Sequence, residues 1–322
     1  MENEKQAENE EKVENEKPKA AFLKKEYLLS LVIFVSALIV GGSIVYTSKT
    51  AKDKSADLLA QNNQGQVAGV IIDENSIIPP EGVELPITWA NLGWQMVDKG
   101  VIDGPKFESL YTQRGGLDEE QKSILYGENN GKIKITPKNS GFLLNIFWAL
   151  GLGNKNSILE KGPMSDPRYG GAKNFASTGG WTMAKGDVMN HYSKYNFISL
   201  TSEQQALVER VSQGIYRPCC GNSTYFPDCN HGMAMLGLLE LMASQGVSEE
   251  EMYKIALKVN SYWFPDTYLT IAQYLKEKKN IVFDQADPKE ILGANYSSGS
   301  GFQAILQQVT PSDKQGGGGC GV

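Results

Sequence analysis

The sequence has few residues of the two types that most often carry metal and nucleophile chemistry, with two histidines and four cysteines in 322 residues. With only His191 and His231, sites built from a histidine cluster are excluded. Four cysteines are too few for a small scaffold held together by disulfides. Basic residues are fewer than acidic ones: the sequence has 31 Lys and Arg and 37 Asp and Glu, which gives a net charge of −6. We therefore expect no nucleic-acid partner.

One long hydrophobic run is present, and residues 27–48 contain no charged side chain. A transmembrane helix needs about 20 such residues. The run is longer than the apolar part of a signal peptide and no A-x-A cleavage site follows, which favours an uncleaved signal-anchor. Four lysines flank the run closely on its N-terminal side, between positions 17 and 25, and three on its C-terminal side, between positions 49 and 54. This bias predicts a cytoplasmic N-terminus. We expect membrane lipid as a partner and the bulk of the chain outside the cytoplasm.

The rest of the chain divides by composition. Residues 1–26 are polar and are expected to form a disordered cytoplasmic head. Residues 49–80 predict a tether, and residues 311–322 a flexible tail rich in glycine. Between them, 81–310 carry apolar residues at helical spacing, with one convincing strand-like fragment at 133–136. Helix-start signals recur along this region, at Asp103, Asp118, Thr201, Ser248 and Asp287. The predicted fold class is mainly α, a helical ectodomain behind a single transmembrane helix.

The start of the hydrophobic run has a second interpretation. Ala21-Phe22 followed by Glu26 resembles a type IV prepilin cleavage region, although Lys24 and Lys25 depart from that pattern. The resemblance implies that Phe22 becomes the first residue and that Glu26 is an assembly residue. A disulfide-stabilised, pilin-like envelope protein is therefore one alternative.

The segment RPCCGNSTYFPDCNHGMAMLG holds most of the residues that could bind a metal. Cys219, Cys220, Cys229 and His231 fall within 13 positions, in a loop that precedes a predicted helix. A set of three cysteines and one histidine matches tetrahedral zinc. It also suits Cu(I), which prefers soft sulfur ligands. The sequence therefore predicts a zinc or copper site at these four residues.

Several alternatives remain open within this segment. Adjacent cysteines do not follow the usual zinc spacing, and neighbouring side chains bind one ion together with difficulty. One alternative is therefore that only one of Cys219 and Cys220 is a ligand. Met233 and Met235 are optional copper ligands or, by their helical spacing, core residues. A disulfide from either adjacent cysteine to Cys229 is the structural alternative, expected outside the cytoplasm. A thiol–disulfide redox enzyme that uses the vicinal cysteines is the enzymatic one.

Three further residues are weaker candidates. Asp187 lies four residues before His191, which allows a carboxylate–imidazole pair on one helix face or a purely structural histidine. Cys320 lies between glycines near the end of the sequence, and three interpretations of it are open. Its thiol reaches another site, it forms an intermolecular link, or it has no role.

A local family resemblance concerns the same loop. Pro218-Cys219-Cys220-Gly221, then Asp228-Cys229 and a helix, resembles bacterial extracytoplasmic proteins that carry a PCYCGC motif. This chain lacks the interleaved spacing and one cysteine of that motif. The resemblance implies a metal-related protein of the cell envelope and assigns no catalytic residue. We therefore expect a membrane-anchored, extracytoplasmic metal-binding protein with a metal-handling, electron-transfer or structural-metal role.

Overall fold

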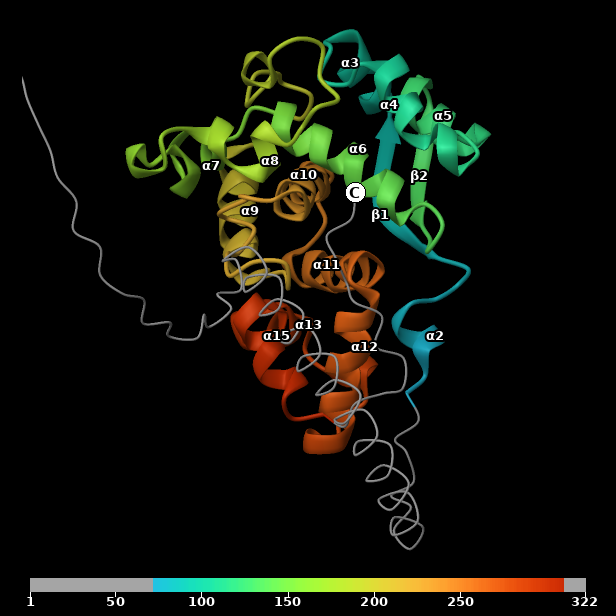
Figure 1. Ribbon diagram of the computed structural model, residues 1–322, viewed down its shortest axis with the longest axis vertical. Coiled ribbons are helices and arrows are strands. Elements are labelled where there is room, and N and C mark those ends of the chain that lie inside the picture. The colour runs from blue at the N-terminus through green and yellow to red at the C-terminus, as the bar shows by residue number, and fades with distance from the viewer. Residues whose placement is uncertain (1–71, 310–322) are drawn as a thin grey trace, which may run out of the picture. The chain divides into compact units, whose positions relative to one another are not determined.

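The computed structural model describes residues 72–309 (Figure 1). The predicted head, the transmembrane helix at 27–48, most of the tether and the tail with Cys320 lie outside this range. Within residues 72–309, no helix combines the length and the apolar character needed to cross a membrane. The anchor therefore stays a prediction from the sequence.

The described residues are mainly helical, as predicted, with one small sheet. The first half contains both strands together with helices of which α6 is the longest: α2 (Glu74–Ile77), β1 (Val83–Ala90), α3 (Leu92–Asp98), α4 (Gly104–Tyr111), α5 (Glu119–Tyr126), β2 (Asn130–Ile135), α6 (Ser140–Gly153), α7 (Ser157–Lys161) and α8 (Ala176–Gly179). The second half is helical: α9 (Ser202–Gly214), α10 (Asn230–Ser244), α11 (Glu249–Trp263), α12 (Pro265–Tyr274), α13 (Pro288–Leu292), α14 (Ala294–Ser297) and α15 (Gly299–Leu306).

The helix starts follow from local capping chemistry. Asp118 and Thr201 each form a capping box with the residue three positions on, at the starts of α5 and α9. Asp103, Ser248 and Asp287 each accept a backbone N–H at the starts of α4, α11 and α13. These caps satisfy amide groups that the first turn of a helix leaves unpaired, and they confirm the predicted helix starts.

Strand β1 was not expected from the sequence. It pairs with β2 in antiparallel fashion, with Val83 opposite Ile135 and Ala90 opposite Asn130. The register is irregular between Glu84 and Thr88, the stretch that contains Pro86. Proline has no N–H to give to the ladder, so it fits where regular pairing is interrupted.

The packed region begins before Glu81, because α2 is part of it. Ile77 is buried in the core. The hydroxyl of Tyr262 donates to the carbonyl of Pro79 at 2.8 Å, and Nζ of Lys258 donates to the carbonyl of Ser76 at 2.8 Å. The last residues assigned to the tether thus belong to the globular region.

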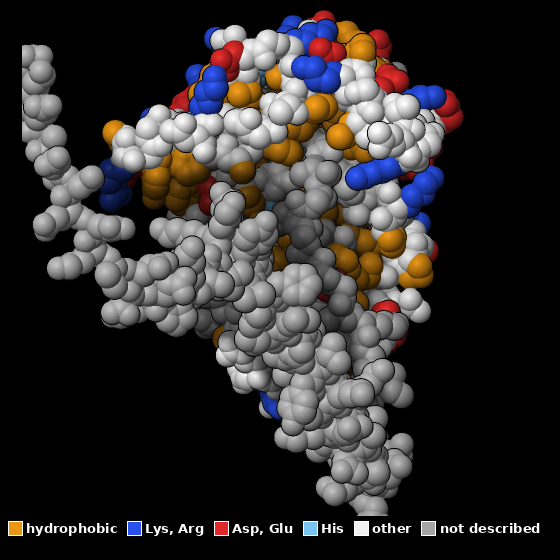
Figure 2. Space-filling model, viewed as in Figure 1, with side chains coloured by type: hydrophobic (Ala, Val, Ile, Leu, Met, Phe, Trp, Pro, Cys, Tyr) orange, Lys and Arg blue, Asp and Glu red, His pale blue; other side chains and the backbone are white. Residues whose placement is uncertain are grey.

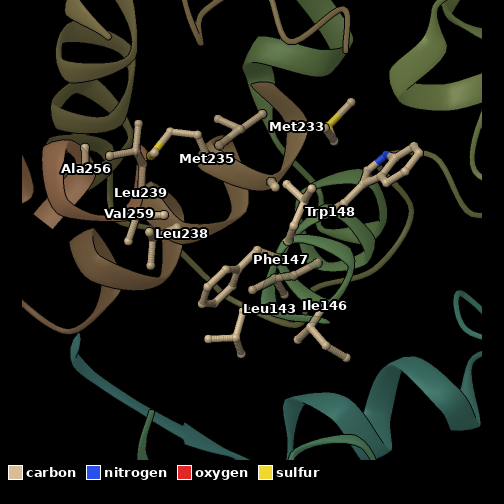
Figure 3. Packing of buried hydrophobic residues seen from close by; sticks show 14 of the residues in the cluster. Leu143, Ile146, Phe147, Trp148, Met233, Met235, Leu238, Leu239, Ala256 and Val259 are labelled. Carbon is tan, nitrogen blue, oxygen red and sulfur yellow. The ribbon is translucent and has the colours of Figure 1, made fainter. Parts of the chain in front are cut away.

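Helices α6 and α10 form the centre of the core and cross at two glycines. A Cβ on Gly151 would lie 2.1 Å from the carbonyl oxygen of Met233, and one on Gly237 would lie 2.6 Å from the backbone nitrogen of Gly151. Only glycine allows this approach, so α6 and α10 pack closely at Gly151 and Gly237. Figure 3 shows the apolar packing between the two helices, including Phe147 and Leu238.

The outer surface is mixed in charge. On the face shown in Figure 2, basic and acidic side chains are interspersed over the part of the chain that the structure describes. Ion pairs among the described residues are mostly exposed, such as Lys122–Glu119 at 2.9 Å and Lys132–Glu84 at 2.8 Å. Exposed pairs of this kind add little stability, so the apolar core carries most of it.

Candidate metal centre

The loop between α9 and α10 folds back on itself and brings the cysteines together. Tyr216 and Ser223 form an isolated antiparallel bridge, and the N–H of Thr224 donates to the carbonyl of Ile215 at 2.8 Å. The chain then returns to α10, whose N-cap residue is Cys229. The adjacent cysteines at the tip of the loop therefore face the start of that helix.

Two groups of potential ligands share Cys229. In the first, the sulfurs of Cys219 and Cys229 and one ring nitrogen of His231 lie within 4.8 Å of one another. The two sulfurs are 3.5 Å apart. In the second group, Cys220 and a carboxylate oxygen of Asp228 join Cys229 within the same limit. The four predicted ligands thus come together, but in two overlapping sets of three.

The two groups differ in whether their potential ligand atoms already have hydrogen-bond partners. Both oxygens of Asp228 are already engaged, since Oδ1 accepts from Arg217 Nη2 at 2.5 Å and Oδ2 accepts from Asn222 Nδ2 at 2.8 Å. Nδ1 of His231, in contrast, is buried without a hydrogen-bond partner, on a side chain only 7% exposed. A buried unpaired polar nitrogen costs free energy unless a ligand satisfies it. The set Cys219, Cys229 and His231 is therefore the better candidate for a metal site.

Aromatic rings hold the His231 side chain in place. The imidazole packs on Phe264 with ring centroids 4.3 Å apart and meets the edge of Trp263 at 5.8 Å. Both aromatic residues lie at the junction of α11 and α12. This packing fixes the ring before any ligand binds, which lowers the entropy lost on coordination.

A buried arginine, which the sequence analysis missed, supports the loop from within. Arg217 is 2% exposed, and its Nε donates to the sulfur of Cys229 at 2.9 Å. Its terminal nitrogens donate to the carbonyls of Asn222 and Phe226 at 2.9 and 3.0 Å, and to Asp228. A Cβ on Gly232 would lie 2.5 Å from the guanidinium carbon, so α10 needs glycine there. The signal in the sequence was an Arg two residues before Cys219 and an Asp directly before Cys229.

The three thiols differ in acidity. Hydrogen bonds from Cys219 and Cys220, together with the charge of Arg217, hold the pKa of Cys229 well below its usual range. Hydrogen bonding to Cys220 and Cys229, with burial, raises the pKa of Cys219. The hydrogen bond between Cys220 and Cys219 lowers the pKa of Cys220. The hydrogen bond with Cys229 and burial outweigh that effect and raise the pKa of Cys220 to about 11. Of the three thiols, Cys229 therefore loses its proton most readily.

The remaining predicted ligands have other surroundings. Met233 and Met235 are 0% and 1% exposed and belong to the hydrophobic core (Figure 3). Asp187 pairs with Lys173 at 2.9 Å and accepts the N–H of Met189.

His191 uses both ring nitrogens away from Asp187. Nδ1 bonds to the hydroxyl of Tyr195 at 2.9 Å, and Nε2 bonds to the carbonyl of Lys185 at 2.8 Å. These contacts give it a structural role.

A second buried polar cluster lies further along α10, and the sequence analysis did not identify it. Glu240 is fully buried, and its two carboxylate oxygens accept from Asn154 Nδ2 at 2.8 Å and from Asn156 Nδ2 at 2.5 Å. Burial raises the pKa of Glu240 to about 8, against the two amide hydrogen bonds that lower it. The cluster links α10 to the chain after α6 and is fully satisfied.

Comparisons with protein-family models, with curated proteins and with solved structures found no match to this chain. The resemblance to the PCYCGC proteins stays a prediction from the loop residues. The case for function therefore depends on the geometry of the site itself.

Proposed function

We propose that this protein binds one thiophilic metal ion, zinc or Cu(I), through Cys219, Cys229 and His231. The observation that carries the proposal is the buried, unpartnered Nδ1 of His231 on a residue grouped with two sulfurs that lie 3.5 Å apart. Thiolate sulfur and imidazole nitrogen are the donors that both metals prefer. The role would be metal handling, electron transfer if the ion is copper, or structural support if it is zinc.

The donor set has the charge that such an ion needs. The pKa of Cys229 lies well below its usual range, which favours the thiolate, and Cys219 would lose its proton on binding. Two thiolates then neutralise a divalent ion, while Arg217 and Asp228 neutralise each other. With zinc, a fourth position remains for Cys220 or for water, whereas Cu(I) is satisfied by two or three soft ligands.

The location of the site is part of the proposal and is supported by the sequence alone. A helix over residues 27–48 would anchor the chain in the cell membrane, with the described region on the outer side. Membrane fractionation would test the anchor, and a membrane-impermeant protease added to intact cells would test the side.

Metal titration of the full chain tests the site. We expect one equivalent of zinc or Cu(I) per chain, released protons on binding, and a loss of affinity of at least about tenfold in His231→Gln. His191→Gln is the matched control, because it replaces the other histidine and should keep the metal. Circular dichroism would verify that both variants fold. Equal metal content in the wild type and Cys229→Ser would refute the proposal.

A further inference from the structure

We infer that Cys219 and Cys229 form a reversible dithiol–disulfide couple, that Cys220 lies outside it, and that oxidation of the couple releases the bound metal. The formation of the disulfide is independent of the proposed function. The release of metal rests on it, since the same two sulfurs would be ligands.

The distance between the two sulfurs supports bond formation. They lie 3.5 Å apart, and a disulfide bond is about 2.05 Å long, so closure needs a movement of about 1.5 Å. Cys229 caps α10 and is fixed by the helix, whereas Cys219 lies in the loop before it. Both residues are partly exposed, which gives a small oxidant access. The loop can supply the movement without disturbing the helix.

Cys220 has different neighbours. Its thiol points to the carbonyl of Asn222 at 3.9 Å and to Oδ1 of Asp228 at 3.7 Å, as well as toward Cys229. A bond from Cys220 to Cys219 would close a strained ring between adjacent residues. These contacts favour Cys219 as the partner of Cys229.

The oxidant class is a low-molecular-weight disulfide, RSSR. The Cys229 sulfur attacks one sulfur of RSSR, the S–S bond breaks, and RS⁻ leaves and takes up a proton. The Cys219 sulfur then attacks Cys229 in the mixed disulfide, gives up its proton, and expels the second RS⁻. Two thiols and RSSR thus yield one protein disulfide and two RSH, with two electrons passed to RSSR. The Nε of Arg217 lies 2.9 Å from the Cys229 sulfur and donates a hydrogen bond to it. This N–H stabilises negative charge on the sulfur when it attacks during oxidation and when it leaves during reduction.

The reaction would remove two of the three ligands together. A disulfide sulfur is not a thiolate, and thiolate is the form that binds zinc and Cu(I). His231 alone cannot retain the ion. Reduction restores both donors, so the redox state of the pair would control metal occupancy.

Glutathione redox buffers test the couple in the full chain after a chelator has removed metal. Free thiols are then alkylated and the disulfide is mapped by mass spectrometry. We expect a single Cys219–Cys229 bond with Cys220 alkylated, the same midpoint in Cys220→Ser, and no bond in Cys219→Ser. Cys320→Ser serves as a background that removes the fourth thiol. The inference is overturned if no disulfide forms, or if Cys220 is found in the bond.

A second measurement separates this inference from the proposed function. Oxidised glutathione is added to the metal-loaded chain, and released metal is read with a colorimetric chelator. We expect one metal released per disulfide, and in His231→Gln a disulfide without bound metal. Metal that stays bound while the disulfide forms would overturn controlled release. A disulfide in a chain that never binds metal would refute the metal proposal and leave the couple intact.

Discussion

The stability of the folded chain should fall as the pH rises through the range in which Glu240 ionises. The carboxyl group is fully buried on α10, and its hydrogen-bond partners are the neutral amides of Asn154 and Asn156. Burial raises its pKa from 4.5 to about 8. In the unfolded chain the same group ionises near 4.5, so between these values the folded state holds a proton that the unfolded state has lost.

The sign and size follow from this difference. A folded pKa above the unfolded one gives stability that is complete below about pH 4.5 and is lost as the pH rises to about 8. Each pH unit in the window should lower the free energy of unfolding by about 1.4 kcal/mol. Over the whole window the loss is of the order of 5 kcal/mol.

Urea unfolding of the wild type and Glu240→Gln between pH 5 and 9 measures this effect. The amide oxygens of Asn154 and Asn156 accept from Ile198 and Ile158, so both amides are fixed with their N–H groups toward Glu240. Glutamine offers those groups one acceptor instead of two, which should cost about 1–3 kcal/mol near pH 5, where the wild-type carboxyl group is protonated. The fall in the free energy of unfolding with rising pH, however, should disappear in Glu240→Gln. The same downward slope in Glu240→Gln would show that another group causes it and would refute the reasoning.

Two further predictions concern packing and the buried arginine. Gly151→Ala should destabilise the fold by about 1–3 kcal/mol or more, because its Cβ would meet backbone of α10, whereas Gly141→Ala on the exposed end of α6 should stabilise it by about 0.5–1 kcal/mol. Thermal unfolding would compare them, and equal effects would contradict the close helix crossing. Arg217→Met should cost about 3–5 kcal/mol in urea unfolding because Asp228 stays largely buried without its partner, and Arg210→Met, at a pair 57% and 33% exposed, should cost about 1 kcal/mol or less. A similar loss in both would show that the Arg217 network adds nothing.

Local sequence was sufficient for elements whose signals are local. Asp118, Thr201 and Ser248 identified helix starts because a cap needs only the next three residues. Strand β1 was missed although Leu85, Ile87 and Trp89 alternate inward, since Pro86 interrupts the run. Its pairing partner lies about 45 residues further on, beyond what a local pattern contains.

Similar limits apply to the site. The three cysteines and His231 were found because they fall in one short segment, yet which of them form a set depended on the fold. Asp187 and His191 failed to pair because the intervening residues form a 3₁₀ turn (Val188–Asn190), where the four-residue spacing of an α-helix does not apply. The aromatic rings that fix His231 come from residues 263 and 264, far along the chain.

Arg217 raises a question about charge that the metal proposal has to answer. The start of α10 carries partial positive charge, and a guanidinium lies 2.9 Å from the Cys229 sulfur, so two positive sources surround the position offered to a cation. Asp228 pairs with the guanidinium and cancels its charge at longer range. What remains beside the sulfur is a directed N–H donor, which stabilises a thiolate whether that thiolate is bound to metal or leaves a disulfide. The same arginine would therefore serve both proposed forms of the site, while two thiolates would supply the charge that a divalent ion requires.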